Sequence, residues 1–524
     1  MRFYHAWMNR LPPFEYSNFW DGVPAKTIFN QRYESLMDKD QRLPNLSSRE
    51  DVGVLLNTPD FLGWPSDTPG HFSLTIVEHL RSIDMLCIGV RECLRCMADH
   101  HRQSGRQPLY KLHMPTFAFV VVGGKAFNAT MGELLDKLLA TLQHAAVDFG
   151  CDVVLLCWER ADFDMLQTLR RHMVRDQPEA LLDLQSGVSA SLRAEAERLA
   201  ELSGRKALAV FAGAGVSVNA GLPNWTQLLD MLASRAGIDH KSSDWRELNV
   251  LSKADLIAKK REGGRQAMFQ DIVHIFDQYQ RCSLVHLMIN SLNCDEIVTT
   301  NYDELLEKAL TSYGRAPELS RLPHAPSHTA DRWILKLHGC VSQPSSIVLT
   351  RQEYIRFSEQ ASALGGIVQA KLMTSHMLFV GFSLDDDNFF KICDTVNRSQ
   401  PEEELSTPFG TALMPRAGAL KKELWQGQVE LVAMQDDGEA NMGVLGRRIA
   451  LFLDYLALKA TSAACPILDE RFEYVMNEGQ KELSEKIKVM VDGLSAAARD
   501  TDEFKMLEET LKRFTCGTEG WRFS

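Results

Sequence analysis

Residues 207–225 have the sequence ALAVFAGAGVSVNAGLPNW, in which an apolar run gives way to a glycine-rich turn. The run 208–211 predicts a buried β-strand, and the residues near Trp225 predict the start of a helix. Gly213 and Gly215 permit positive φ angles and let backbone N–H groups approach a phosphate at a helix N-terminus. Tight strand-to-helix turns also need glycine for structural reasons, so the turn alone is weak evidence for a nucleotide site.

Three more apolar runs, at 297–300, 333–337 and 377–380, each end in a polar loop. Loops at the carboxyl ends of strands in an open parallel sheet converge on one crevice, where ligands bind. The sequence therefore predicts an α/β domain with a Rossmann-like parallel sheet and four loops at one edge.

Uncharged hydrogen-bonding groups lie at the end of the second run, at Thr300, and directly after it, at Asn301, before the carboxylate of Asp303. An amide at this place can hold a water molecule or a carboxamide without adding charge. The alternative is that Asn301 only caps the helix that follows.

His338 follows the third run directly, where its near-neutral pKa suits a general base and Gly339 allows a ligand to approach closely. A purely structural histidine is the alternative. Gly381 and Ser383 repeat the strand-to-glycine turn after the fourth run, and the serine hydroxyl could bind a ribose or a phosphate.

Taken together, the motifs GAGVSVNAGLPNW, TTNYD, KLHG and GFSLDD, in this order, resemble those of the sirtuin superfamily. The likeness is strongest to the divergent, zinc-free sirtuin-like branch of NAD hydrolases, many of which act in bacterial antiviral defence. This resemblance implies that NAD is the substrate and that Asn301 and His338 are catalytic. The residues that it implies for NAD binding are Gly213, Ala214, Gly215, Ser217, Gly221, Pro223, Trp225, Thr300, Asp303, Gly381 and Ser383.

Two departures separate the chain from the protein deacetylases of the superfamily. Those enzymes carry a zinc ribbon of two Cys-x-x-Cys pairs after the catalytic histidine, whereas residues 338–381 contain only Cys340. Their Gly-Ile-Pro-Asp-Phe-Arg motif is replaced by a stretch that ends in Asn224-Trp225-Thr226 and lacks the arginine. We therefore expect NAD cleavage without zinc, not deacylation.

The chain has 524 residues, enough for two or three domains. We expect an N-terminal α/β domain at 1–185, for which regulation is the candidate role, the sirtuin-like NAD-binding domain at 186–460 and a C-terminal helical appendage at 461–524. In the first, the runs 117–122 and 153–158 flank an amphipathic stretch and predict a βαβ unit, with a helix at 164–175. Its Gly123-Gly124 pair favours a structural βα turn over a second nucleotide site.

The N-terminal region also contains a group of possible metal ligands on one expected helix. We favour packing of small apolar cysteines there over metal binding, since no second ligand pair has finger spacing. The group consists of Cys93, Cys96, His100 and His101.

The formal net charge of −12 argues against general binding of nucleic acid. The basic residues at 259–265 are expected to form a solvated helix face. Scattered cysteines, 11 in number, fit a reducing compartment, so we expect a cytoplasmic protein without a signal peptide or a membrane span.

The predicted function is hydrolysis of NAD to nicotinamide and ADP-ribose or a cyclic isomer. Unrestrained hydrolysis would poison the cell, so we expect regulation through homo-oligomers and an activating protein or nucleotide signal. The alternatives are an NAD-dependent deacylase or ADP-ribosyltransferase, a non-catalytic NAD or ADP-ribose sensor, and a scaffold with a vestigial site.

Overall fold

The computed structural model divides into two compact units. Unit 1 comprises Met1–Leu109, Met114–Ser186 and Ala463–Ser524, and unit 2 comprises Tyr110–His113 and Gly187–Ser462. The structure describes residues 130–157, 160–176, 190–218, 220–279, 282–292, 294–311, 318–330, 332–360, 362–399, 408–435, 442–460 and 476–512. It also describes 3–7, 54–57, 73–76, 116–120, 467–468, residue 473 and some positions between 83 and 102.

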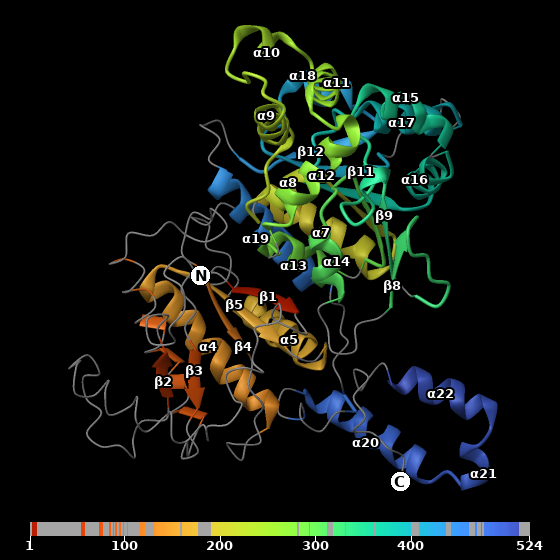
Figure 1. Ribbon diagram of the computed structural model, residues 1–524. Helices are drawn as coiled ribbons and strands as arrows, with labels where there is room; N and C mark the ends of the chain where they lie inside the picture. The colour runs from red at the N-terminus through yellow and green to blue at the C-terminus, as the bar shows by residue number, and fades with distance from the viewer. Residues whose placement is uncertain are drawn as a thin grey trace, which may run out of the picture. The chain divides into compact units, whose positions relative to one another are not determined.

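Unit 2 is built on a seven-stranded sheet in which every neighbouring pair of strands is parallel (Figure 1). The order across the sheet is β12-β11-β10-β6-β7-β9-β8. The strands are β6 (Leu208–Ala212), β7 (Glu296–Thr299), β8 (Leu319–Leu322), β9 (Arg332–Lys336), β10 (His376–Val380), β11 (Gly410–Met414) and β12 (Val429–Ala433). This confirms the predicted Rossmann-like fold, and each of the four predicted strands lies within one residue of its expected bounds.

Strand β6 is where the order of the sheet reverses. The chain runs from β6 to β7, β8 and β9 on one side, and then crosses to β10, β11 and β12 on the other. Such a reversal leaves a crevice at the carboxyl ends of the strands, since the loops that follow neighbouring strands turn in opposite directions. All five residues of β6 are buried, as expected for a central strand covered on both faces.

Helices cover both faces of this sheet (Figure 1). On one side α19 packs against α7 and α13, and on the other α15, α16 and α17 share an apolar core with the sheet. The helices are α7 (Ala190–Gly204), α8 (Ala214–Val218), α9 (Trp225–Arg235), α10 (Ser243–Glu247), α11 (Val250–Lys260), α12 (Gly264–Phe276), α13 (Leu284–Ser291), α14 (Leu305–Thr311), α15 (Arg351–Gln360), α16 (Ser362–Thr374), α17 (Asp387–Ser399), α18 (Ala419–Leu424) and α19 (Met442–Ala460), with a 3-10 turn at Pro344–Ser346.

Helices α9 to α12 form a separate helical cluster within unit 2, with its own apolar core. Asp271 fixes this cluster, because its carboxylate accepts hydrogen bonds from Arg235 at 3.1 Å and from Arg261 at 2.6 Å. Tyr302 and Leu305, which follow β7, belong to the same core. The cluster therefore packs directly against the loop that carries Asn301.

Unit 1 contains a three-stranded sheet in the order β1-β5-β4, whose pairs are parallel, and an antiparallel pair β2-β3. Its helix α4 begins after Thr130, whose side chain accepts a hydrogen bond from the Glu133 amide, and ends at Gly150 in the left-handed region. The strands are β1 (Phe3–Trp7), β2 (Val54–Asn57), β3 (Ser73–Ile76), β4 (Thr116–Val120) and β5 (Asp152–Cys157). The helices are α4 (Met131–Phe149), α5 (Arg160–Asp176), α20 (Glu478–Asp492), α21 (Ala496–Arg499) and α22 (Asp502–Lys512).

The predicted βαβ unit of the N-terminal region is confirmed as β4, α4 and β5. The C-terminal helices share its apolar core, since Val491 and Phe504 are buried in one cluster with Leu134 and Leu138 of α4. Gly123, Gly124 and the possible metal ligands Cys93, Cys96, His100 and His101 lie outside the described residues. None of the described helices is long and apolar enough to cross a membrane.

Close contact between two glycine turns predicts a large effect of Gly381→Ala. Gly381 has a φ of +64°, and an added Cβ would lie 2.5 Å from the Val216 backbone nitrogen. We expect the free energy of unfolding of unit 2 to fall by about 1 to 3 kcal/mol or more, measured by chemical unfolding followed with tryptophan fluorescence. Gly366→Ala is the matched control: nothing lies within 4 Å of the added methyl group, and alanine favours the helix. Equal stability of the two variants would contradict the prediction.

Candidate functional site

The turns after β6 and β10 bond directly to each other. The Gly213 amide donates to the Val380 carbonyl, and the Gly215 amide donates to the Gly381 carbonyl, each at 2.9 Å. A Cβ on Gly213 or Gly215 would lie within 2.9 Å of the Gly381 backbone. These glycines are therefore required by the packing of one turn on the other, and their amides are already engaged. Ala214, between them, is exposed.

Ser217 lies at the centre of a buried hydrogen-bond network. Its hydroxyl donates to Asp303 Oδ2 at 2.8 Å and accepts from Asn301 Nδ2 at 3.1 Å. Nε2 of His286, a residue of α13, lies 3.3 Å from the same hydroxyl. The Ser217 hydroxyl is thus occupied by the protein itself, and its role is to fix the side chains around it.

The contacts of His286 determine its tautomer. The Ser283 backbone N–H donates to Nδ1 at 3.1 Å, so Nδ1 is the acceptor and Nε2 carries the hydrogen. Burial lowers the pKa of His286 to about 4, against the opposing effect of the Asp303 carboxylate. The ring is therefore neutral at neutral pH and donates to Ser217, whose own proton must then point to Asp303.

This network sets the orientation of the Asn301 amide. Its Nδ2 donates to Ser217 Oγ and to the Gly213 carbonyl, both at 3.1 Å, while its backbone N–H donates to the Thr299 hydroxyl. Its side-chain oxygen, Oδ1, is buried without a hydrogen-bond partner. A buried acceptor without a partner costs free energy, which a donor from water or a ligand would recover.

His338 presents a second unpartnered atom. Thr299 of β7 and Lys336 of β9 are partners in the parallel register. Asn301 lies two residues after Thr299, and His338 lies two residues after Lys336. Both side chains therefore leave neighbouring strands at the same edge of the sheet. The His338 side chain is 3% exposed, and its Nε2 has no hydrogen-bond partner.

Aromatic rings and one carboxylate surround the His338 imidazole. Tyr354 and Phe357 of α15 contact the ring edge-on, with centroids 5.5 and 5.7 Å away. Asp386 Oδ2 lies 3.7 Å from Nε2, beyond hydrogen-bond distance. Burial lowers the pKa of His338, and the Asp386 carboxylate opposes this effect. Near neutral pH His338 is therefore uncharged and able to accept a proton.

A buried ion pair supports this edge of the sheet from beneath. Lys336 Nζ lies 3.0 Å from Glu307 Oε1 of α14 and donates to the Asp303 carbonyl. Burial alone would favour an uncharged lysine, but Glu307 and the other nearby groups, Asp303 among them, together outweigh burial and raise the pKa of Lys336. Because the charged lysine bonds to the Glu307 carboxylate and to the Asp303 carbonyl, it links β9 to the first turn of α14 and the residues before it. Removing either partner would leave a buried charge uncompensated.

The loop from Gly221 to Trp225 joins the site to the helical cluster. Asn224 caps α9 in a capping box with Gln227, which gives a structural use to the asparagine that replaces the aspartate of the deacetylase motif. The centroid of the Trp225 ring lies 5.9 Å from the centroid of the Tyr302 ring. Gly221, exposed, has a φ of +97°, and Pro223 is half-buried.

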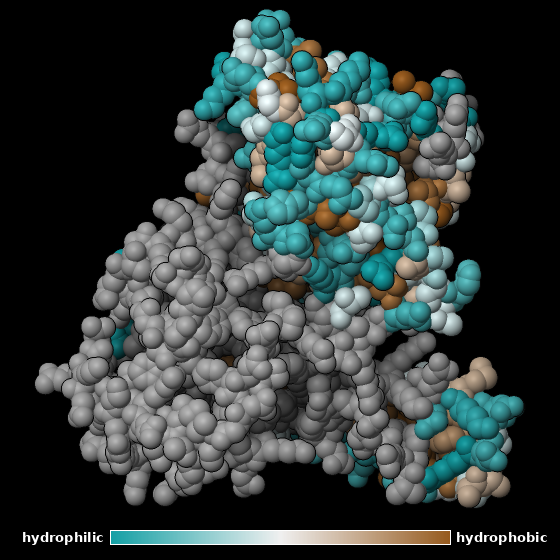
Figure 2. All heavy atoms as spheres, in the orientation of Figure 1, coloured by the Kyte–Doolittle hydropathy of each residue, from teal (hydrophilic) through white to brown (hydrophobic). Residues whose placement is uncertain are grey.

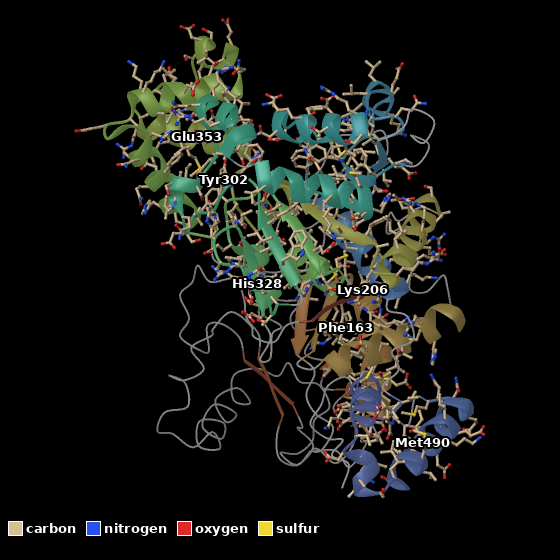
Figure 3. All side chains as sticks on the ribbon, turned by 90° about the vertical axis from the view of Figure 1, so that its right-hand side faces the viewer. Phe163, Lys206, Tyr302, His328, Glu353 and Met490 are labelled. Atoms are coloured by element: carbon tan, nitrogen blue, oxygen red, sulfur yellow. The ribbon has the colours of Figure 1, made fainter. Side chains whose placement is uncertain are left out.

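Figure 3 shows how this end of the sheet is built. Tyr302 and Glu353 lie near each other, close to helices α9 to α12, whereas Lys206, just before the amino end of β6, lies away from them. Thr300 is half-buried beside Asn301.

Other sequence-predicted groups have roles in packing. Gly339 has a φ of +87°, and its Cβ position would lie 2.2 Å from the Ser346 carbonyl oxygen. The expectation that this glycine admits a ligand was therefore wrong, because backbone fills the space. Ser383 is exposed, and its carbonyl accepts a hydrogen bond from Lys421 at 2.7 Å. Among the described residues, no three His, Cys, Asp or Glu side chains gather as a metal site.

Comparison with known proteins agrees with these motifs. Residues 295–430 match the SIR2-like domain family. The chain contains a sirtuin-like domain. It is similar to the NAD(+) hydrolase ThsA of Enterococcus faecium, with 29% identity over 204 residues, covering 38% of this chain and 42% of the relative.

Two further relatives show the same partial coverage. The ThsA NAD(+) hydrolase of Cytobacillus dafuensis is 30% identical over 34% of this chain and 35% of its own length. Defense-associated sirtuin 2 of Bacillus subtilis is 24% identical over 41% of this chain and 21% of its own length. The chain thus spans less than half the length of each of these relatives.

Several residues that surround the candidate site were not found from the sequence. His286, Glu307 and Tyr354 lie on helices, and only the fold brings them to the loops. Asp386 was visible in the GFSLDD motif but was assigned no role. The one local signal for His286 is Ser283 three residues before it, a capping-box spacing.

The buried neutral His286 predicts a specific dependence of stability on pH. Its pKa is about 4 in the folded chain against an ordinary value of 6.5. The unfolded chain therefore binds the extra proton between these pH values, and stability falls as pH falls through this range. His286→Gln lacks this effect but loses buried hydrogen bonds, so it should be about 1 to 3 kcal/mol less stable at pH 7.

We expect the stability advantage of the unmodified protein over His286→Gln to shrink steadily from pH 6.5 to pH 4.5. Chemical unfolding at a series of pH values measures this difference, and the other histidines cancel because both proteins contain them. An advantage that is constant over this range would show that His286 is protonated in the folded state.

Proposed function

We propose that the sirtuin-like domain is an NAD glycohydrolase that releases nicotinamide and ADP-ribose or a cyclic isomer. The observation that carries this proposal is the pair of buried, unpartnered atoms Asn301 Oδ1 and His338 Nε2 at one sheet edge. Support comes from the relatives named NAD(+) hydrolase. In this reading the crevice beside the β6 and β10 turns takes the dinucleotide, with Ala214, Gly381 and Ser383 along it.

The chemistry requires orientation more than acid catalysis. Cleavage of the nicotinamide–ribose bond has an oxocarbenium-like transition state, and the nicotinamide leaves with the bonding electron pair as a neutral molecule. Asn301 Oδ1 accepts a hydrogen bond from the attacking water or a ribose hydroxyl and fixes its direction. His338, uncharged because of burial, accepts the proton that this oxygen loses as it bonds to the ribose carbon.

The surroundings of His338 favour hydrolysis over deacylation. A deacylase must bring an acyl-lysine side chain beside the catalytic histidine. Here Tyr354 and Phe357 of α15 pack on that histidine, which is 3% exposed. The same aromatic cover helps to exclude bulk water from the ribose, which strengthens the electrostatic effects of Asn301 and His338.

A defence role and control by assembly are further parts of the proposal. One relative is named a defense-associated sirtuin. A homo-oligomer in the cytoplasm, switched on by a protein or nucleotide signal, would prevent NAD loss in the resting cell. Exposed apolar side chains on α16 and α18 offer contact area, among them Met373 and Leu420 at 54% and 82% exposure. Figure 2 shows such apolar patches scattered over a mainly hydrophilic face of unit 2.

Asn301→Ala and His338→Ala should each reduce NAD cleavage by about 100-fold or more. Chromatography of nicotinamide and ADP-ribose measures the loss, with a peptide-dependent assay for acyl transfer run alongside. His328→Ala, which removes an exposed histidine of the same unit, is the control and should keep full activity. Circular dichroism confirms that the fold is retained.

Either variant with near-normal turnover would refute the role given to that residue. Binding of NAD without turnover by the unmodified protein would identify a sensor instead, and acyl-ADP-ribose formation would identify a deacylase.

Control by assembly predicts that specific activity rises with protein concentration, since association follows mass action. Light scattering and NAD consumption are measured on the same samples of the full chain. Leu420→Glu places a charge on the exposed face of α18 and should weaken both association and activity at a given concentration. A protein that is monomeric throughout, with constant specific activity, would contradict this part of the proposal.

A further inference from the structure

Asp386 has two hydrogen-bond partners and faces a third group. Its Oδ1 accepts from the Phe389 backbone N–H at 2.9 Å, which caps α17. Its Oδ2 accepts from the Tyr354 hydroxyl at 3.0 Å and lies 3.7 Å from His338 Nε2. The carboxylate is therefore fixed from two sides, with one oxygen next to the unpartnered nitrogen of the histidine.

We infer that Asp386 is a positioning residue for His338, acting as the counter-ion of the imidazolium that forms during NAD cleavage, and that Tyr354 limits this effect. The inference rests on the proposed function. In the reaction, the oxygen of water, or of an adenosine-ribose hydroxyl where a cyclic isomer forms, bonds to the anomeric carbon of the nicotinamide ribose and gives its proton to Nε2, while nicotinamide leaves with the electron pair of the broken bond. The new N–H points back to the oxygen that gave the proton, and the positive charge of the ring then lies beside Asp386 Oδ2, 3.7 Å from Nε2, where the two opposite charges attract each other.

Tyr354 opposes this interaction because its hydroxyl shares the same carboxylate oxygen. A hydrogen bond to Oδ2 withdraws negative charge that would otherwise stabilise the imidazolium. The phenol is committed to this contact, since burial and then Asp386 raise the pKa of Tyr354 far above its ordinary value. Tyr354 therefore remains a neutral donor over the pH range in which a histidine titrates.

The other charged groups nearby do not compete for His338. Glu353, also on α15, bonds to Arg265 at 2.6 Å and to the Thr350 amide at 2.7 Å. Asp387 is exposed, and the Tyr302 hydroxyl donates to the Val348 carbonyl. Asp386 is the group whose charge acts against burial on the pKa of His338.

The two residues should shift the pH dependence in opposite directions. Asp386→Asn removes the negative charge but keeps a capping oxygen for α17, so the His338 imidazolium is less stable and its pKa falls. The acid limb of the kcat profile moves to lower pH, and kcat on the plateau falls by about 10-fold or more because the counter-ion is lost. Tyr354→Phe leaves more charge on Oδ2, which raises the pKa of His338 and moves the acid limb to higher pH.

Asp387→Asn is the matched control. It removes the same charge at the next position, which is exposed, and should leave the acid limb and kcat unchanged. A general loosening of the site would move both Asp386→Asn and Tyr354→Phe in the same direction.

A second readout does not require turnover. Carbon-13 at Cε1 of the histidines reports ring ionisation by NMR, and the resonance that disappears in His338→Gln identifies His338. Its midpoint should fall in Asp386→Asn, rise in Tyr354→Phe and stay unchanged in Asp387→Asn. If NAD is not cleaved but these shifts occur, the proposed function fails and the pairing of Asp386 with His338 stands. Shifts in one common direction, or none, overturn the inference whether or not NAD is cleaved.

Discussion

Contact between the turns after β6 and β10 is the constraint on which the site depends. Two backbone hydrogen bonds join them, from Gly213 to Val380 and from Gly215 to Gly381. No side chain fits between the turns, because a Cβ on any of these three glycines would lie within 3 Å of the opposite backbone. The two turns therefore lie in contact at the point where the strand order reverses. Helix α8 follows the first turn, and its residue Ser217 is directed toward the loop after β7.

Ser217 follows these turns and orients three side chains around it. Its hydroxyl accepts from Asn301, donates to Asp303 and contacts His286, so each neighbour has a defined direction of donation. As a result, the side-chain nitrogen of Asn301 is fully bonded, and its side-chain oxygen is the atom left without a hydrogen-bond partner. Among the side chains of this network, Asn301 Oδ1 is the buried polar atom without a hydrogen-bond partner, and its direction is already fixed by the bonds that its neighbours make.

His338 depends on a different part of the molecule. Helix α15 brings Tyr354 and Phe357 against the ring, and the start of α17 brings Asp386. Burial and charge act in opposite directions on this histidine, so a small change in its carboxylate neighbour changes its basicity. Residues 338–381, which lack the cysteine pairs of a zinc ribbon, instead supply α15 and α16 to the apolar core beside the sheet.

The sequence by itself determined the parallel sheet, the four loops at its edge and two of the residues at the centre of the candidate site. Apolar runs that end in glycine or a polar residue are local signals, and Asn301 and His338 each follow such a run directly. The tertiary structure alone decided which atoms of those residues are free. It also gave Gly213, Gly215 and Gly339 their role in packing, because a close approach between backbones distant in sequence leaves no pattern of its own. His286, Glu307, Tyr354 and Asp386 reach the site from helices or helix ends whose sequence periodicity reports only which face is buried. A burial pattern shows that a polar side chain points inward, whereas its partner is set by the packing of elements far apart in the chain.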